Sequence, residues 1–349
     1  MAVAIRFRPF RKLLAGPRAP RRAVAVGGGF VVAFAAVLAA GELYLRSAAP
    51  ADLAEFLPES DRTGPFRADP KYGVRYRSLD ALAADNRVRF DLYRPLLDRP
   101  HPAPTWAFFG SSFVQAPGML ADTTSVLVPQ RVTFALGKNE VFPVRFAQAE
   151  LLLDSGLNPQ RVFLVVIPLD VYTFAQHGLD QHRATPGGAL AYEPRLPPVG
   201  GALVRNSRLA LKGWTRTTLH QNRPFYPSQA LFDRVDPAVR ADVRTVLGHF
   251  AGAAARHRVP VTVVLLPAHE QVCRGAGFAV QDALAEDARA VGFDVCDVRG
   301  AFLAWPDKPG LFIPDKHFSA AGNRLLLATI VSHLKATDPR SADLPEVRP

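Results

Sequence analysis

Short apolar segments alternate with longer amphipathic segments from residue 105 onward. Five of these apolar runs contain few polar positions and are separated by stretches of helical character. They lie at 105–109, 131–136, 161–167, 261–266 and 293–298. Near-continuous apolar runs of this kind are typical of strands in a parallel sheet that is covered on both faces. The pattern therefore predicts five buried strands.

The segments between these runs predict crossover helices. Residues 144–156 and 283–292 have helical periodicity, and residues 236–257 place the apolar positions Val239, Val243 and Phe250 on one face. A further apolar stripe follows Ser319, whose residue type is favoured at the N-cap of a helix. Alternation of strands and helices indicates a three-layer α/β domain.

The N-terminal region has a different pattern. Residues 1–22 carry seven Arg or Lys residues and no acidic residue, and residues 23–41 form an uncharged apolar run. About 20 apolar residues can span a bilayer as a helix, and preceding positive charge favours a cytoplasmic N-terminus. We expect a basic cytoplasmic tail at 1–22 and a single-pass transmembrane anchor at 23–45 in the inner membrane, with the rest of the chain periplasmic. A signal peptide cleaved near Ala39 and Gly41 is the alternative.

The remaining boundaries follow from composition. Residues 46–104 are rich in Pro, Asp and Arg and are expected to be a linker and pre-domain segment. The α/β domain is expected at 105–336 with an insertion at 173–235, and residues 337–349 are expected to be a C-terminal tail. Without the seven basic residues of the first segment, the net charge of +11 falls to +4. No nucleic-acid-binding module is recognisable, so no nucleic-acid partner is expected.

Residues that can carry chemistry follow the predicted strands. In chain order they are Gly110, Ser111, Ser112, Gly137, Asp170, Asp315 and His317. Because the carboxyl ends of parallel strands meet at one edge of a sheet, we expect these residues to converge there. A serine hydroxyl needs a neighbouring base to act as a nucleophile, and a histidine oriented by an aspartate provides one. The pattern therefore indicates a candidate serine nucleophile.

The blocks around these residues resemble those of the SGNH (GDSL-type) hydrolase and acyltransferase family over about residues 105–335. Gly110-Ser111-Ser112 resembles the Gly-Asp-Ser block of that family, and Gly137 matches its second-block glycine. The stretch from Asp315 to Asn323, Asp-Lys-His-Phe-Ser-Ala-Ala-Gly-Asn, resembles the last block. The third block departs from the family pattern, because Leu169 stands where an oxyanion asparagine is usual.

The resemblance implies a fold and a set of site residues. The fold is a three-layer, flavodoxin-like parallel sheet, the SGNH hydrolase fold. The implied catalytic residues are Ser112, His317 and Asp315, and the implied oxyanion hole contains Ser112, Gly137 and Asn139, the last as a substitute for the missing asparagine. We expect no cofactor and no metal.

Two functions follow from this resemblance. The first is a membrane-anchored, outward-facing serine esterase or O-acyltransferase that acts on an acyl ester of a cell-envelope or exported glycan. The basic tail and the apolar span look like those of the membrane-anchored family members, which include alginate O-acetyltransferase-like proteins. The alternative is a non-catalytic SGNH-like domain that binds a glycan or a membrane partner during envelope or exopolysaccharide assembly. Retention of all three catalytic residues favours the first, and Leu169 favours the second. The expected partners are the ester substrate and, through the N-terminal helix, the lipid bilayer.

The chain has two cysteines. Cys273 follows the fourth predicted strand, and Cys296 lies on the fifth, so that both approach one edge of the sheet. In an oxidising compartment such a pair can form a disulfide, which we expect here, with two separate thiols as the alternative. Cys273 also occupies the place where a zinc-protease helix beginning at His269-Glu270 would need its second histidine.

Overall fold

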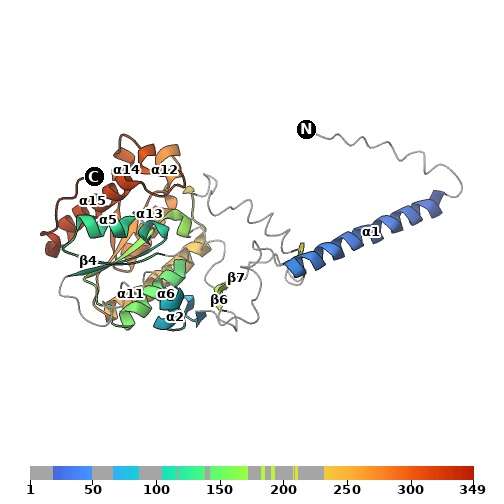
Figure 1. Cartoon of the computed structure of the whole chain (residues 1–349), viewed down its shortest axis with the longest axis horizontal. Helices are drawn as coiled ribbons and strands as arrows, with labels where there is room; N and C mark the ends of the chain where they lie inside the picture. The colour runs from blue at the N-terminus through green and yellow to red at the C-terminus, as the bar shows by residue number, and fades with distance from the viewer. Residues whose placement is uncertain are drawn as a thin grey trace. The chain divides into compact units, whose positions relative to one another are not determined.

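The computed structural model describes residues 19–48, 66–85, 104–115, 118–137, 142–171, 182–184, 190–192, 207, 209–210 and 232–349. The chain divides into two units. One contains residues 1–54 and 196–221, and the other contains residues 55–195 and 222–349. The second unit holds the α/β domain (Figure 1).

A five-stranded parallel sheet forms the centre of this domain. Its strands are β3 (Thr105–Gly110), β4 (Val132–Gly137), β5 (Arg161–Val166), β8 (Val261–Leu265) and β9 (Asp294–Asp297). They lie in the order β4-β3-β5-β8-β9, and every neighbouring pair is parallel. This is the flavodoxin-like order, in which ligand sites lie beyond the carboxyl ends of the strands. The five predicted strands are confirmed, and no strand end differs from the prediction by more than one residue.

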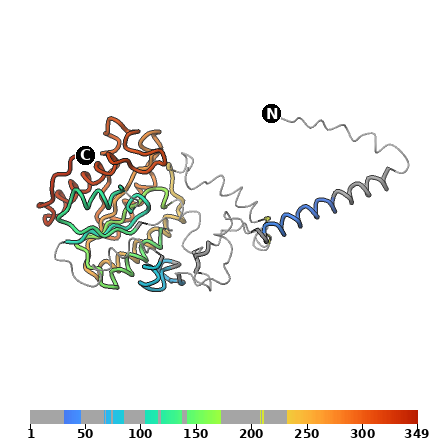
Figure 2. The backbone as a smooth tube through the Cα atoms, viewed as in Figure 1, coloured from blue at the N-terminus to red at the C-terminus, as the bar shows by residue number. Residues whose placement is uncertain are grey.

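Helices cover both faces of the sheet because successive strand residues alternate between two cores. Ala107 and Phe109 belong to one core, and Trp106 and Phe108 belong to the other. The first core is covered by α6 (Phe142–Asp154), α11 (Pro237–Arg256) and α13 (Ala279–Ala290). The second is covered by α4 (Ser112–Gln115), α5 (Leu120–Leu127), α12 (His269–Arg274), α14 (Arg299–Ala304), the 3₁₀ turn Pro309–Leu311 and α15 (Ala320–Thr337). Figure 1 and the trace in Figure 2 show α6 and α15 on opposite sides of the sheet, which confirms the three-layer α/β prediction.

Helix α11 shows how local sequence fixes an element. The Asp236 carboxylate accepts a hydrogen bond from the Ala238 backbone N–H at 2.8 Å, and Pro237 occupies the first helical position, where its missing N–H costs nothing. The predicted apolar face, which includes Val243 and Phe250, is buried against the sheet.

The segment before the sheet differs from the linker that we expected at 46–104. Its described part forms a hairpin of β1 (Phe66–Asp69) and β2 (Gly73–Tyr76), followed by α2 (Leu79–Asp85). Tyr72, Tyr76 and Leu82 are fully buried in the core that contains α6. Three isolated large residues are enough to dock the segment, although they produce no sustained periodicity in the sequence.

A buried carboxylate joins this hairpin to the domain. Glu150 of α6, whose side chain is 2 % exposed, accepts hydrogen bonds from Lys71 Nζ at 2.8 Å, the Tyr72 hydroxyl at 2.6 Å and Arg256 Nη2 at 2.8 Å. Burial by itself raises the pKa of Glu150, but these three donors outweigh it and lower the pKa from 4.5 to about 2. The carboxylate is therefore charged in the folded protein down to low pH.

We expect Glu150→Gln to destabilise the domain in a pH-dependent way. Since the folded pKa lies below the unfolded one, the stabilisation is fully present above pH 4.5 and is lost as the pH falls towards 2. Its size is on the order of 3 kcal/mol. Urea denaturation of both proteins between pH 7 and pH 2 measures the difference. The control is Asp154→Asn, which alters a half-exposed carboxylate on the same helix. A difference between wild type and Glu150→Gln that does not shrink in acid would contradict the prediction.

The C-terminal residues 337–349 pack on the domain, so the expected tail is wrong for this segment. A 3₁₀ turn forms at Pro339–Ser341, and Leu344 is buried in the second core. Asp338 pairs with Arg161 at 2.7 Å, and Asp343 pairs with Arg131 at 3.0 Å. These contacts lie at the amino ends of the strands, because Arg131 precedes β4 and Arg161 begins β5.

The predicted insertion at 173–235 lies largely outside the described residues. Within it, β6 (His182–Ala184) and β7 (Leu190–Tyr192) form an antiparallel pair. Phe232 is buried in the second core, so the domain already resumes before residue 235.

The first unit is described mainly by helix α1 (Ala19–Ala48). Its Glu42 carboxylate accepts hydrogen bonds from the Ser207 hydroxyl and the Leu209 backbone N–H, both at 2.9 Å. A helix forms where we expected the anchor at 23–45. However, no helix in the described part of the chain is long and apolar enough to cross a membrane. Alanine and glycine, which contribute little apolar surface, fill much of this run and include three consecutive glycines at 27–29.

Candidate active site

Strand β3 brings Ser112 to the carboxyl edge of the sheet. The strand ends at Gly110, Ser111 follows in a bend, and α4 begins at Ser112. A Cβ atom on Gly110 would lie 2.5 Å from Val114 Cγ2 and 2.9 Å from the Val165 carbonyl oxygen. Only glycine therefore allows β3 to end so close to α4 and β5.

Asp315 and His317 lie on a tight loop, residues 312–318, whose two ends form an antiparallel bridge. The Ile313 N–H donates to the His317 carbonyl oxygen at 2.9 Å, and the Lys316 N–H donates to the Ile313 carbonyl oxygen at 2.8 Å. The loop thus turns back on itself. A turn of this kind is what two-residue spacing requires if Asp315 is to orient the imidazole of His317.

Helix α15 fixes the end of this loop. The Ser319 hydroxyl accepts from the Gly322 N–H at 3.2 Å and donates to the Gly310 carbonyl oxygen at 2.7 Å, which confirms Ser319 as the N-cap. The buried Asn323 side-chain amide donates to the carbonyl oxygens of Phe318 at 3.2 Å and Ser319 at 3.0 Å. The loop is therefore held to a long, buried helix.

The structure brings Ser112, His317 and Asp315 together across more than 200 residues of sequence. Ser112 Oγ lies 2.6 Å from His317 Nε2, and His317 Nδ1 lies 3.1 Å from Asp315 Oδ1. A base at hydrogen-bond distance can take the hydroxyl proton, and a carboxylate on the opposite ring nitrogen favours the tautomer that leaves Nε2 free to accept it.

The Asp315 carboxylate that contacts His317 is exposed to solvent. Its side chain is 64 % exposed, and the oxygen that faces His317 Nδ1 also accepts from the His317 backbone N–H at 3.1 Å. The backbone hydrogen bond, followed by the contact with the imidazole, lowers the pKa of Asp315 below its usual value. The carboxylate is therefore charged at neutral pH, but water competes for it.

Phe113 is a site residue that the sequence pattern did not indicate. Its ring lies 4.7 Å from the His317 ring, with the two planes 33° apart, and it also contacts the buried Phe318 edge-on at 5.0 Å. The residue next to Ser112 therefore packs against the imidazole. An aromatic residue directly after the serine was the available signal, but an apolar residue is common at the start of a buried helix.

The structure describes Ser112 and Gly137 of the expected oxyanion hole but not Asn139. Gly137 ends β4 directly opposite Gly110 in the sheet register, so it lies at the same edge as Ser112. Asn139 lies outside the described residues. Leu169 follows β5 in a short helical turn and packs against the second core.

Asp170 has a structural partner. Its Oδ1 accepts a hydrogen bond from Arg145 Nη2 at 2.8 Å, and its Oδ2 forms an ion pair with Arg145 Nη1 at 2.7 Å. Oδ2 also accepts from the Ile167 N–H at 3.1 Å. Both charged side chains are less than a tenth exposed. The pair joins the first turn of α6 to the segment after β5, and both of these lie at the carboxyl edge of the sheet.

The expected disulfide is absent, because Cys273 and Cys296 are both free thiols. Cys296 lies within the sheet, level with Val264 of β8, whereas Cys273 lies on α12 beyond the end of that strand. The two cysteines therefore do not share one level of the sheet. Burial raises the pKa of the Cys296 thiol to about 12, so this thiol is unreactive at neutral pH.

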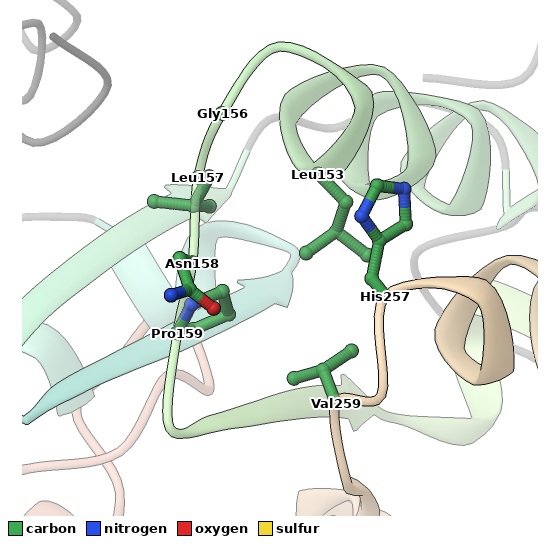
Figure 3. A pocket seen from close by; sticks show the side chains of 7 residues that line it. All are labelled: Leu153, Gly156, Leu157, Asn158, Pro159, His257 and Val259. Carbon is green, nitrogen blue, oxygen red and sulfur yellow. The ribbon is translucent and has the colours of Figure 1, made fainter. Parts of the chain in front are cut away.

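No cluster of three or more His, Cys, Asp or Glu residues that could hold a metal occurs among the residues with described positions. A pocket of about 150 Å³ is lined by residues that precede β5 and β8 (Figure 3). It therefore lies at the amino edge of the sheet, whereas Ser112 follows the carboxyl end of β3. Its lining includes Pro159, His257 and Val259, and His257 Nε2 is bound to Asp154 at 2.8 Å. This pocket is separate from the serine site.

Comparisons with known proteins return similar backbones. No family model matches the sequence, and no curated protein matches it significantly. Similar solved structures include a lipase/acylhydrolase from Enterococcus faecalis, with 13 % identity, a TM-score of 0.39, and coverage of 70 % of this chain and 100 % of that one. An α/β hydrolase, LAE5, from the metagenome of Lake Arreo in Spain has 12 % identity, a TM-score of 0.40, and coverage of 66 % and 95 %. The acetyl xylan esterase AlAXEase has 13 % identity, a TM-score of 0.37, and coverage of 65 % and 98 %.

Proposed function

We propose that this chain is an SGNH-type serine enzyme that removes an acyl group from an ester. The observation that carries the proposal is the contact of 2.6 Å between Ser112 Oγ and His317 Nε2, with Asp315 on the other ring nitrogen. A serine hydroxyl in this position, at the carboxyl edge of a flavodoxin-like sheet, has the base that it needs for nucleophilic attack.

The reaction proceeds in two steps. Ser112 Oγ attacks the ester carbonyl carbon while His317 Nε2 takes the hydroxyl proton, and the negative charge that develops on the carbonyl oxygen faces backbone N–H groups of Ser112 and Gly137. The carbon–oxygen ester bond then breaks, and His317 returns the proton to the leaving alcohol. An acyl group remains on Ser112.

The second step releases this acyl group. An incoming hydroxyl gives its proton to His317 Nε2 and attacks the acyl carbon, after which Ser112 Oγ leaves and regains the proton. If the hydroxyl belongs to water, the enzyme is an esterase. If it belongs to a sugar, the enzyme is an O-acyltransferase. We propose an acylated glycan as the substrate class, supported by the basic segment 1–22 and the apolar run 23–41, which look like the N-terminal region of family members that modify exported polysaccharides.

A fluorophosphonate probe tests the proposal. The probe loses fluoride when an activated serine oxygen bonds to its phosphorus, so we expect the wild-type protein to be labelled and the adduct to map to Ser112. Ser111→Ala is the matched control, since it alters the neighbouring hydroxyl, and it should label normally. An adduct on Ser111 would contradict the mechanism. A wild-type protein that never labels would support the alternative, a non-catalytic binding domain, which Leu169 in the third block favours.

We also propose that the domain acts outside the cytoplasm. The support is the step from seven basic residues in 1–22 to the apolar run at 23–41. A reporter that is active only in the periplasm, fused after residue 349, is expected to be active. An intact full-length fusion whose reporter is inactive would contradict export.

A further inference from the structure

We propose that the ion pair between Glu270 and Lys316, called the pin below, positions the loop that carries His317 (residues 312–318). The inference rests on the proposed function and adds two positioning residues to it. Lys316 lies between Asp315 and His317, and its ammonium group is bound to the Glu270 carboxylate on α12. Both side chains are largely buried, 23 % and 15 % exposed, so water competes for this pair less than it does for Asp315.

The backbone of Lys316 needs such a restraint. Pro314 occupies the second position of the turn that the Lys316 N–H closes, and Lys316 itself follows in the left-handed region with φ of +71°. A turn followed by a left-handed residue is a common tight hairpin loop, and glycine or asparagine is the usual residue at that point. A residue with a Cβ atom disfavours the left-handed region. The loop therefore uses a strained lysine where glycine would be relaxed, and the ion pair compensates for that strain.

Glu270 is itself held in a rigid frame. The next residue, Gln271, is buried and accepts from the Ala268 N–H at 2.8 Å, while its amide donates to the Gly277 carbonyl oxygen at 2.6 Å. Gln271 also exchanges hydrogen bonds with the buried Gln281 of α13 at 2.7 Å and 3.0 Å. Helix α12 is thus fixed to α13 by buried amides, so Glu270 offers the loop a stationary partner.

The pin complements the weak hold of Asp315. Since the Asp315 carboxylate is exposed and uses one oxygen for two contacts, it orients the imidazole without fixing the loop that carries it. The loop must nevertheless keep His317 within 2.6 Å of Ser112 Oγ. Small displacements of a reacting group cost large factors in rate. The Glu270–Lys316 pair supplies the missing restraint from the side of α12.

Four variants of the full chain test the pin. Glu270→Gln and Lys316→Met remove one charge each, Lys316→Arg keeps the charge, and Lys316→Gly relieves the left-handed strain but removes the ammonium group. We expect kcat for a model acetate ester to fall about tenfold in the first two, with KM unchanged, and to be largely retained in Lys316→Arg. Lys316→Gly separates the backbone strain of this residue from its ion pair with Glu270, because it relieves the first and removes the second. If the pin matters, this variant loses activity as Lys316→Met does. Asp343→Asn, which breaks an ion pair at the opposite edge of the sheet, is the matched control.

Hydrogen exchange of the loop provides a readout that needs no activity. The Ile313 and Lys316 amides should exchange faster in Glu270→Gln, whereas the Asn323 amide inside α15 should not change. Unchanged exchange in the loop would overturn the inference, whatever the activity. Faster exchange with normal kcat would also overturn it, because the loop would then not need the pin. A wild-type protein without esterase activity or probe labelling would instead overturn the proposed function, and exchange alone would then decide whether the pair holds the loop.

Discussion

Ser112→Ala is expected to remove nearly all ester cleavage, a loss of about 10⁶-fold in kcat. The hydroxyl that it deletes is the one that lies 2.6 Å from His317 Nε2. No substitute is expected from Ser111, because this neighbouring side chain is buried. The variant should fold normally, since Ser112 is only partly buried and alanine is well tolerated at the start of a helix.

His317→Ala should cost about as much, and the double variant should lose little more, because nucleophile and base act as one unit. Asp315→Asn should cost less. A buried triad aspartate is worth about 10⁴-fold in kcat. Asp315 is 64 % exposed, and water already competes for its carboxylate, so we expect a loss of about 10²-fold.

Release of acetate from a model ester measures all of these variants, with thermal unfolding as a check on folding. Ser111→Ala serves as the matched control and should keep most of its activity. Undiminished turnover by a folded Ser112→Ala protein would refute the mechanism. Equal losses in Asp315→Asn and His317→Ala would show that the exposed carboxylate contributes more than its surroundings indicate.

Asp170→Asn is expected to destabilise the domain by about 3–5 kcal/mol, since it leaves the charge of Arg145 buried without its partner. Both side chains are less than a tenth exposed, and Asp170 receives two nitrogen atoms of the guanidinium group. Removal of one member of such a pair costs more than replacement of both members by apolar residues.

A double variant separates these two effects. Arg145→Met with Asp170→Leu should recover much of the stability that Asp170→Asn loses, as measured by urea denaturation. If Asp170→Asn remains stable but loses ester cleavage, Asp170 acts on the reaction and the structural assignment is wrong. The sequence placed Asp170 at the active edge, and this experiment tests whether it only braces that edge.

The sequence predicted the sheet well because its strands are buried on both faces. Each strand is then a nearly unbroken apolar run. Each run ends at a change in composition, which located the strand ends to within one residue. The serine and the Asp-His loop were predicted for a related reason. Ser112 directly follows the recognisable strand β3, and the Asp-His loop directly precedes the recognisable helix α15.

Contacts between distant side chains were beyond the sequence. Glu150 binds Lys71 and Tyr72 across 78 or more residues, and no local pattern marks that pairing. The disulfide prediction was wrong because nearness to one edge of the sheet does not fix the position of a residue along the strand direction. Cys296 lies within β9, whereas Cys273 lies on α12 beyond the end of β8. The hairpin at 66–76 was missed because two buried tyrosines dock it without periodicity.

The position of α15 late in the chain has a consequence for synthesis. The helix covers much of the face formed by Trp106, Phe108 and Phe163, yet residues 320–337 leave the ribosome long after those strands. Until then the apolar face of the nascent sheet lacks that cover. Unpaired apolar surface on an incomplete sheet is prone to aggregate. The same interval separates Ser112 from its base, so a nascent chain has no activated serine until nearly all of the domain has emerged.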